Sequence, residues 1–182
     1  MNIFYVHETP SICAQQHVDK HVVKMILEYA QLLSTAHRVL DGVSIVGKSK
    51  TGRKQTRYVL SDDRDSVLYN ATHLNHPSAK WTRHSACNYR WLFKLWIELM
   101  REYNYRYGKI HASARLIPHL KNLPKNIQEL GFLHHGEQCL KNTNLIALNL
   151  TILLNHTVHI TMVLKQTCLS GKIDQHQSGF YK

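Results

Sequence analysis

Apolar residues recur with a helical period over residues 11–40. On a helical wheel they fall in one arc of roughly 100°, which marks the buried face of an amphipathic helix. The members of this arc are Val18, Val22, Met25, Ile26, Tyr29, Leu33, Ala36 and Leu40. Thr9 and Pro10 supply a helix start, and Gly42 supplies an end. The pattern predicts one long helix whose apolar face enters the core.

A second helical pattern covers residues 78–107. Pro77 disfavours the α conformation at His76, so residues 73–77 should form a turn before this helix, and Gly108 should end it. Its broad apolar face consists of Trp91, Leu92, Leu95, Trp96, Leu99, Met100 and Tyr103. We expect this segment to be the central core helix.

The remaining segments are shorter. Residues 3–6 form a β-prone run that predicts a buried strand or an extended arm, and residues 43–60 contain two β-branched runs around a Gly- and Lys-rich centre, which is typical of a hairpin. Residues 62–72 predict a short helix. The expected fold is all-α: a compact bundle of a few long helices with a small β-hairpin insertion, forming a single helical domain over residues 1–132, followed by an irregular, atypical tail over residues 133–182.

Composition narrows the class of partner. The chain has 182 residues, 43% of them hydrophobic, and a formal net charge of +11, which suits a single globular domain that binds a polyanion, usually nucleic acid. The cysteines at 13, 87, 139 and 168 form no CxxC pair, which argues against a zinc ribbon. The first residues lack the pattern of a signal peptide, and no run of 18 apolar residues predicts a membrane span. We therefore expect a cytoplasmic protein.

A polar stripe follows the first predicted helix at steps of 4, 3, 4 and 3 residues: His17, His21, Lys24, Glu28 and Gln31. A histidine pair at this spacing can ligate a metal, but Glu28 lies about 10 Å further along the axis than His21 and Lys24 would repel a cation. The stripe suits a cleft for general acid–base chemistry, with an exposed helix face as the alternative. Our catalytic candidates are His17, His21, Lys24 and Glu28, with no metal and no cofactor.

Three basic clusters are candidates for nucleic-acid binding. The first is the hairpin tip, the second surrounds the turn before the second helix, and the third, at that helix's end, mixes cations with tyrosines that could stack on bases. Each has a structural alternative: a solvated loop, a capped turn, or tyrosines packed inward. With Lys20 added, the candidates are Lys20, Lys48, Lys50, Arg53, Lys54, Arg57, His73, Asn75, His76, Arg83, Arg106 and Lys109.

Three blocks carry a family resemblance: CAQQHVDKHVVKMILEYAQLLSTAHRVL, HLNHPSAKW and YRWLFKLWIELMREYNYRYGKIH. Over about residues 1–132 they resemble a family of small, mostly uncharacterised phage proteins. Their order also resembles, more remotely, the pyrimidine-dimer DNA glycosylases of the phage endonuclease V type. The latter resemblance implies a compact all-α enzyme that cuts DNA through an N-terminal amine, which forms a Schiff base at the sugar with help from a glutamate of the first helix.

Transferred position by position, this resemblance places the family histidine on His17 and the catalytic glutamate on Lys24, with Glu28 one turn later. Asn2 is too bulky for efficient removal of the initiator methionine, so the amine would belong to Met1; Lys20 or Lys24 could supply it instead. The implied function is a DNA-binding protein acting on damaged or modified DNA, as a glycosylase and AP lyase. The alternatives are a non-catalytic phage DNA-binding accessory protein and a metal-dependent hydrolase using His17, His21 and His73 or His76. We expect DNA as the partner and a monomer in the cytoplasm, that of the host if the chain is phage-encoded.

The tail does not follow the family pattern, which is expected to close with segments like PPxxMPxEYK and RPxPxWF. Codons for residues 134–144, read one base upstream, permit PPWRAMPEEYK, and the same shift over residues 168–180 permits MPxWKNRPTPxWF. We hypothesise a one-base frameshift near Phe132, which the encoding nucleotide sequence would test.

Overall fold

The computed structural model describes residues 1–48, 52 and 54–134, all of which fall in one unit. The elements in chain order are α1 (Pro10–Gln15), α2 (Asp19–Asp41), β1 (Val43–Lys48), β2 (Lys54–Val59), α3 (Arg64–Val67), α4 (Pro77–His84), α5 (Ala86–Tyr107), the 3-10 turn η1 (Ala112–Leu116) and α6 (Ile117–Leu120). The fold is mainly α with one two-stranded antiparallel sheet among these residues, as the sequence predicts. Lys50, Arg53 and the predicted frameshift region beyond residue 134 lie outside the described residues.

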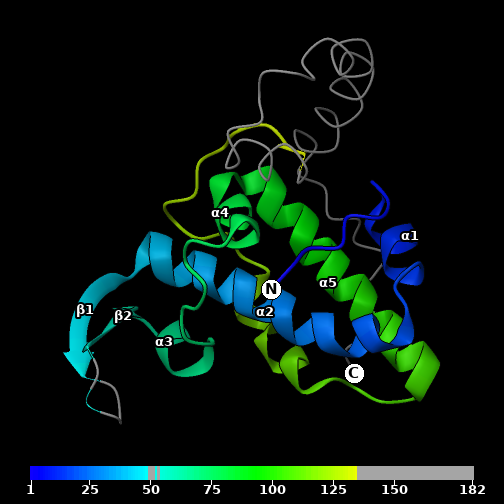
Figure 1. Cartoon of the computed structure of the whole chain (residues 1–182), viewed down its shortest axis with the longest axis horizontal. Helices are drawn as coiled ribbons and strands as arrows, with labels where there is room; N and C mark the ends of the chain where they lie inside the picture. Colours follow the sequence, from blue (N-terminus) through cyan, green and yellow to red (C-terminus); the bar gives the residue numbers. More distant parts are fainter. Residues whose placement is uncertain (49–51, 53, 135–182) are drawn as a thin grey trace. The chain divides into compact units, whose positions relative to one another are not determined.

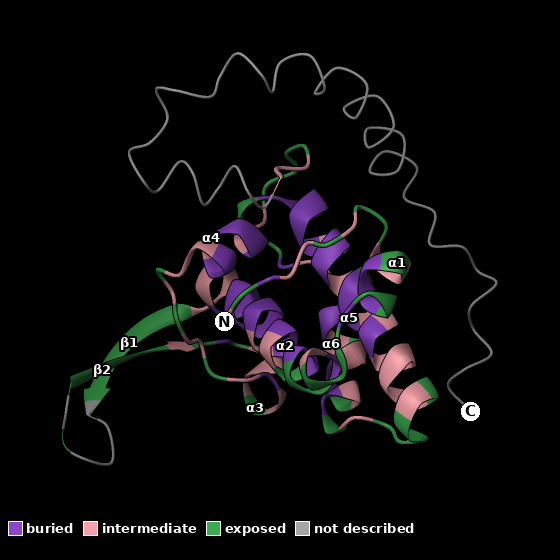
Figure 2. Cartoon of the chain, turned by 45° about the vertical axis from the view of Figure 1, so that its right-hand side comes forward, coloured by how far each residue is buried: buried purple, intermediate pink, exposed green. Residues whose placement is uncertain are grey.

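Helices α2 and α5 form the centre of the core, and α1 and α4 pack beside them (Figure 1). Two indole N–H groups of α5 connect distant segments: Trp96 donates to the Ile26 carbonyl at 2.9 Å and Trp91 donates to the Glu8 carbonyl at 2.7 Å. The inward faces of both helices are buried (Figure 2), which confirms the two predicted core stripes. Val18 is an exception, because its side chain is 59% exposed.

The first predicted helix is in fact two helices. Gln15 ends α1 and Asp19 begins α2, and Val18 between them has extended backbone dihedrals. The guanidinium of Arg106, on α5, donates to the carbonyls of Gln15 and His17 at 3.0 and 2.8 Å and pairs with Asp19. Backbone carbonyls that would accept bonds from a continuing helix are satisfied by this distant side chain instead. The break also explains the exposure of Val18.

The second predicted helix is also divided, at Ser85. This residue has φ −146° and ψ 155°, and its hydroxyl caps α5 by accepting from the Asn88 N–H at 3.1 Å. The Asn88 amide then donates to the Trp81 carbonyl at 2.9 Å, which holds the end of α4 against the start of α5. The helix predicted over residues 62–72 is reduced to the single turn of α3.

The hairpin pairs Val43 with Val59 at its base and Lys48 with Lys54 at its far end. It extends from the C-terminal end of α2, away from the helices (Figure 1). Gly42 is needed where the hairpin leaves α2, because a Cβ atom there would lie 2.5 Å from the Arg38 carbonyl oxygen. The strands expose apolar and basic side chains together, including Ile45, Val46 and Arg57.

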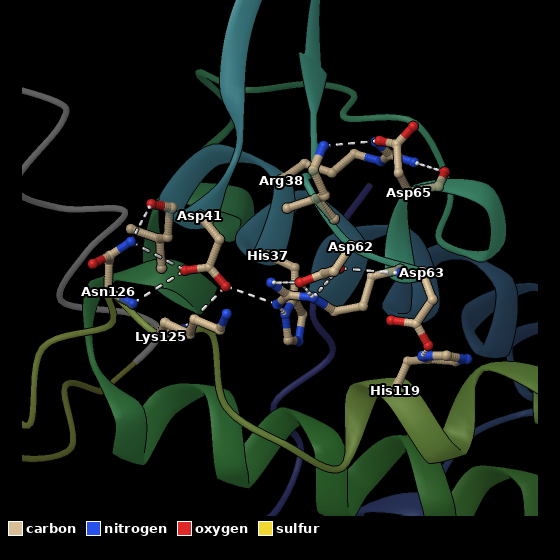
Figure 3. A network of polar contacts seen from close by, with 12 residues as sticks. His37, Arg38, Asp41, Asp62, Asp63, Asp65, His119, Lys125 and Asn126 are labelled. Carbon is tan, nitrogen blue, oxygen red and sulfur yellow. Dashed lines mark hydrogen bonds and ion pairs between the residues drawn. The ribbon is translucent and has the colours of Figure 1, made fainter.

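Arg38 anchors the base of the hairpin and α3. Its buried guanidinium donates to the carbonyls of Tyr58, Leu68 and Tyr69 and to the Asp65 carboxylate and carbonyl, at 2.6–2.9 Å. All five N–H donors of an arginine can be used in such an arrangement. One side chain of α2 therefore fixes three later segments of the chain (Figure 3).

A second network surrounds the buried side chain of His37 (Figure 3). Arg64 donates to its Nδ1 at 2.8 Å, so its Nε2 carries the proton and donates to the Tyr89 hydroxyl at 2.8 Å, which donates to the Leu120 carbonyl at 2.9 Å. Burial, assisted by the Arg64 charge, lowers the pKa of His37 to about 4. The imidazole is therefore neutral at pH 7.

This pKa makes the stability of the protein depend on pH. In the unfolded chain His37 binds a proton near its ordinary pKa of 6.5, whereas in the folded chain it does so only near 4. The contribution of His37 to the free energy of unfolding is therefore fully present above pH 6.5. About 3 kcal/mol of it is lost as the pH drops toward 4. We expect the difference in unfolding free energy between the wild type and His37→Gln to shrink by about that amount from pH 7 to pH 4 in urea titrations. A difference that is independent of pH would contradict this assignment.

Candidate functional site

The first residues of the chain form an extended arm that is anchored on α2. The Phe4 N–H donates to the Tyr29 hydroxyl at 3.1 Å, which in turn donates to Nε2 of His17 at 3.3 Å. Nδ1 of His17 donates to the Cys13 carbonyl at 2.7 Å. The Phe4 ring also stacks on the ring of His21, with centroids 4.3 Å apart. These contacts fix the direction of the chain as it passes over α2.

The anchored arm brings the Met1 amino group to Glu28. The nitrogen lies 3.9 Å from Oε2 of Glu28, and Nζ of Lys24, one helical turn earlier, lies 3.4 Å from Oε1. The Met1 and Glu28 side chains are 4% and 15% exposed, whereas that of Lys24 is 69% exposed. One carboxylate thus lies close to both the Met1 amino group and the exposed side chain of Lys24.

The turn before α4 carries His76, which interacts electrostatically with this group. His76 caps α4, because its Nδ1 accepts from the Ser78 N–H at 3.2 Å. Burial lowers the pKa of His76, and the nearby positive charges of the Met1 amine and His73 lower it further, against the opposing effect of Glu28. The imidazole is therefore neutral at pH 7 and lies within electrostatic reach of both the amine and the carboxylate.

Two contacts hold this turn in place. His73 adopts the left-handed region with φ 49°, and its carbonyl accepts from the His76 N–H at 2.9 Å. A β-carbon makes this conformation unfavourable, so surrounding contacts must maintain it. The Thr72 N–H donates to the hydroxyl of Thr35 on α2 at 3.2 Å. The predicted turn over residues 73–77 is therefore held against α2, the same helix that carries Glu28.

Chemically, the cluster contains a nucleophile and groups that can move its proton. A deprotonated amine attacks carbonyl carbons, and a carboxylate beside it can hold or accept a proton during that reaction. A neutral imidazole can accept a proton as well. Met1, Glu28 and His76 thus provide the components for covalent amine catalysis.

The structure revises the predicted polar stripe. His17 lies in the break between α1 and α2, is 4% exposed, and uses both ring nitrogens within the fold. Burial lowers its pKa, so it is neutral and supports the arm instead of facing a cleft. The ring of His21 is stacked against Phe4. Of the four catalytic candidates, Lys24 and Glu28 are brought together, and the Met1 amine joins them.

The predicted nucleic-acid-binding residues are distributed along the length of α2. Lys54 and Arg57 are exposed on β2, in the hairpin that follows one end of α2. Lys20 and Lys109 are exposed near the other end of this helix, which is about 33 Å long. Lys48 ends β1. Glu28 lies between the two ends, so a ligand that touches both must be long.

Arg106 has a structural role in this arrangement. Its guanidinium makes four hydrogen bonds, to the carbonyls of Gln15 and His17 and to the carboxylates of Asp19 and Glu102. These bonds hold α5 to the α1–α2 junction and leave few donors for an external phosphate.

The second basic cluster is divided between surface and interior. His73 and Asn75 are exposed in the turn, whereas Arg83 is partly buried and donates through Nη2 to the Leu74 carbonyl at 2.7 Å. Sequence reasoning missed the role of Tyr29, which its apolar arc assigned to the core. The side chain is indeed buried, but its hydroxyl anchors the arm, and no local pattern indicates that contact across 25 residues.

No family model, curated protein or solved structure matches this chain. Within residues 1–48, 52 and 54–134, no helix is long and apolar enough to cross a membrane. In the same residues no group of three or more His, Cys, Asp and Glu side chains is placed to hold a metal ion.

Proposed function

We propose that this protein is a DNA-acting enzyme that processes damaged or modified sites through an amine-based glycosylase and AP lyase reaction. The observation that carries the proposal is the approach of the Met1 nitrogen to the Glu28 carboxylate, at 3.9 Å. This pairing supplies an amine and an acid of the first long helix, the two groups that the family resemblance implies. Lys24 occupies the position of the expected acid, and Glu28, one turn later, takes its place beside the amine.

The reaction on an abasic site would follow from these groups. Once the Met1 ammonium group has passed a proton to a nearby base, the lone pair of its nitrogen attacks C1′ of the open-chain deoxyribose aldehyde, and loss of water gives an iminium ion. A base then removes a proton from C2′, and the electrons expel the phosphate oxygen from C3′. Hydrolysis of the imine restores the amine. Glu28 and the neutral His76 are the candidates for these proton transfers.

Charge and extent support DNA as the substrate. The formal net charge of +11 favours a polyanion, and the exposed Lys54 and Arg57 of the hairpin can follow its phosphates. An enzyme that works on a base must expose that base from the duplex, which requires contacts on both sides of the reaction site. Cationic residues at both ends of α2, with Glu28 between them, fit that requirement.

Borohydride trapping tests the proposal directly. We expect the wild-type chain, incubated with abasic duplex DNA and sodium borohydride, to form a covalent protein–DNA adduct. Peptide mass spectrometry should locate the adduct on the Met1 amine. An adduct on Lys20 or Lys24 would keep the reaction class but overturn the assigned nucleophile. No adduct, together with salt-dependent binding, would favour a non-catalytic DNA-binding protein instead.

The structure gives less support to the metal-dependent hydrolase. That function would require His17 as a metal ligand, but both ring nitrogens of His17 are hydrogen-bonded, to the Cys13 carbonyl and the Tyr29 hydroxyl. A ligand histidine must offer a ring nitrogen to the metal. His17 could do so only if the N-terminal arm lost its anchor.

A further inference from the structure

A hollow of about 280 Å³ lies where α4 ends beside the end of α2. Its lining consists of Leu40, Lys80, Arg83, His84, Asn126 and Gln128. Lysine, arginine, histidine and amide side chains can all donate hydrogen bonds, and no carboxylate belongs to the lining. The hollow therefore has the donors and the positive charge that a small anion requires.

Arg83 provides an independent indication of a missing ligand. Its Nη2 donates to the Leu74 carbonyl, but its Nη1 is buried and has no acceptor among the described residues. Burial lowers the pKa of this guanidinium. Buried polar groups in folded proteins are normally paired, so Arg83, a lining residue of the hollow with one unpaired guanidinium nitrogen, lacks an acceptor that such a group normally has.

One acid that adjoins the lining, Asp41, is bound by other groups. Asp41 follows Leu40, but its carboxylate accepts from Arg64 at 2.7 Å and from the N–H groups of Lys125 and Asn126 at 3.0 and 3.1 Å. Figure 3 shows the Asn126 amide turned toward the same carboxylate. These bonds hold the rim of the hollow in place while leaving Lys80, Arg83 and His84 without an acidic partner in the lining.

We propose that this hollow binds a phosphate group. Phosphate offers several acceptor oxygens and negative charge, which matches a guanidinium, an ammonium and an imidazole on one helix. Leu40 is twelve residues after Glu28 on α2, about 18 Å along the axis, which corresponds to roughly five base-pair steps of duplex DNA. A DNA backbone phosphate is one source of this ligand, and free phosphate is the other. The DNA source rests on the proposed function.

The test uses the full chain and a double variant, Lys80→Ala with His84→Ala, which leaves the internal bond of Arg83 intact. Inorganic phosphate binding is measured by calorimetry, and binding of intact duplex DNA by fluorescence anisotropy over a salt series. We expect phosphate affinity to fall at least about tenfold and the slope of log K against log salt to become shallower by about 0.9 for each lost phosphate contact. Lys94→Ala, which removes an exposed lysine of α5 outside the hollow, serves as the control and should change neither.

The outcomes separate the sources. Loss of both phosphate affinity and salt slope supports a DNA backbone phosphate, whereas loss of phosphate affinity alone supports a free-phosphate site. A wild type that does not bind phosphate, or a double variant that binds it as well as the wild type, overturns the proposal. Borohydride trapping with saturating abasic DNA reports on the amine chemistry separately, so either proposal can fail while the other stands.

Discussion

Glu28→Gln should lower the rate of cleavage at abasic sites by roughly a hundredfold or more, with little change in stability. General acid–base groups typically contribute 10²- to 10⁴-fold, and the amide keeps the size of the side chain while removing its capacity to hold a proton. The Lys24 side chain that pairs with Glu28 is 69% exposed, and the Met1 nitrogen lies 3.9 Å away, so the loss of these weak ion pairs costs about 1 kcal/mol. Single-turnover cleavage of abasic duplex DNA and thermal unfolding measure the two effects.

Two further variants make this experiment specific. Lys24→Ala removes the lysine partner of the Glu28 carboxylate and leaves the Met1 amine in place. The cleavage rate of this variant should stay within about tenfold of the wild-type rate. A glycine added before Met1 converts the attacking amine into an amide nitrogen and moves the free amine one residue away from Glu28, so trapping should fall sharply. If Glu28→Gln cleaves as fast as the wild type, the carboxylate is not part of the reaction and the proposed mechanism is wrong.

Arg38→Lys should destabilise the fold by about 3–5 kcal/mol, although the charge is retained. A lysine has three donors on one nitrogen and cannot reproduce the planar fork that reaches Tyr58, Leu68 and Tyr69. Several buried carbonyls would then lose their donor, and removal of a buried partner is strongly destabilising. Urea unfolding at pH 7 gives the free energy, and hydrogen exchange of β2 should show the largest loss of protection.

Arg90→Lys is the matched control. Arg90 makes a two-pronged contact with Glu129 at 2.9 and 3.2 Å, but these side chains are 40% and 66% exposed. Exposed ion pairs contribute little, so this variant should cost less than about 1 kcal/mol. Equal destabilisation by the two substitutions would show that the buried network around Arg38 contributes no more than a surface pair.

The pattern of apolar residues was sufficient for the main elements and the core. The stripe through Met25, Ile26 and Leu33 is buried as the helical period requires, and Gly108 ends α5 in the left-handed conformation. The break before Asp19 could not be predicted in the same way. It depends on Arg106, which lies about 90 positions further along the sequence than its partners Gln15 and His17. Local sequence patterns carry no information about such distant contacts.

The candidate site was accessible to sequence reasoning only in part. Glu28 and His76 stood out through the residue types around them, but the spacing also selected His17, which faces the interior. A helical wheel assumes that the helix continues, and His17 precedes the first turn of α2. The approach of Met1 to Glu28 depends on a hydroxyl of Tyr29 that accepts from the backbone of Phe4, a contact that no periodicity encodes.

The contacts that anchor the first residues have a consequence for synthesis. Glu8 is held by Trp91, and the carbonyls of Gln15 and His17 are held by Arg106. These partners are translated about 80–90 residues later than the segments they hold, which at 5–20 residues per second is a delay of roughly 5–20 s. The first residues of the chain therefore lack these partners until α5 has left the ribosome. A nascent chain that stops before Trp91 should carry the Met1 amine on a segment that lacks both of these contacts with α5.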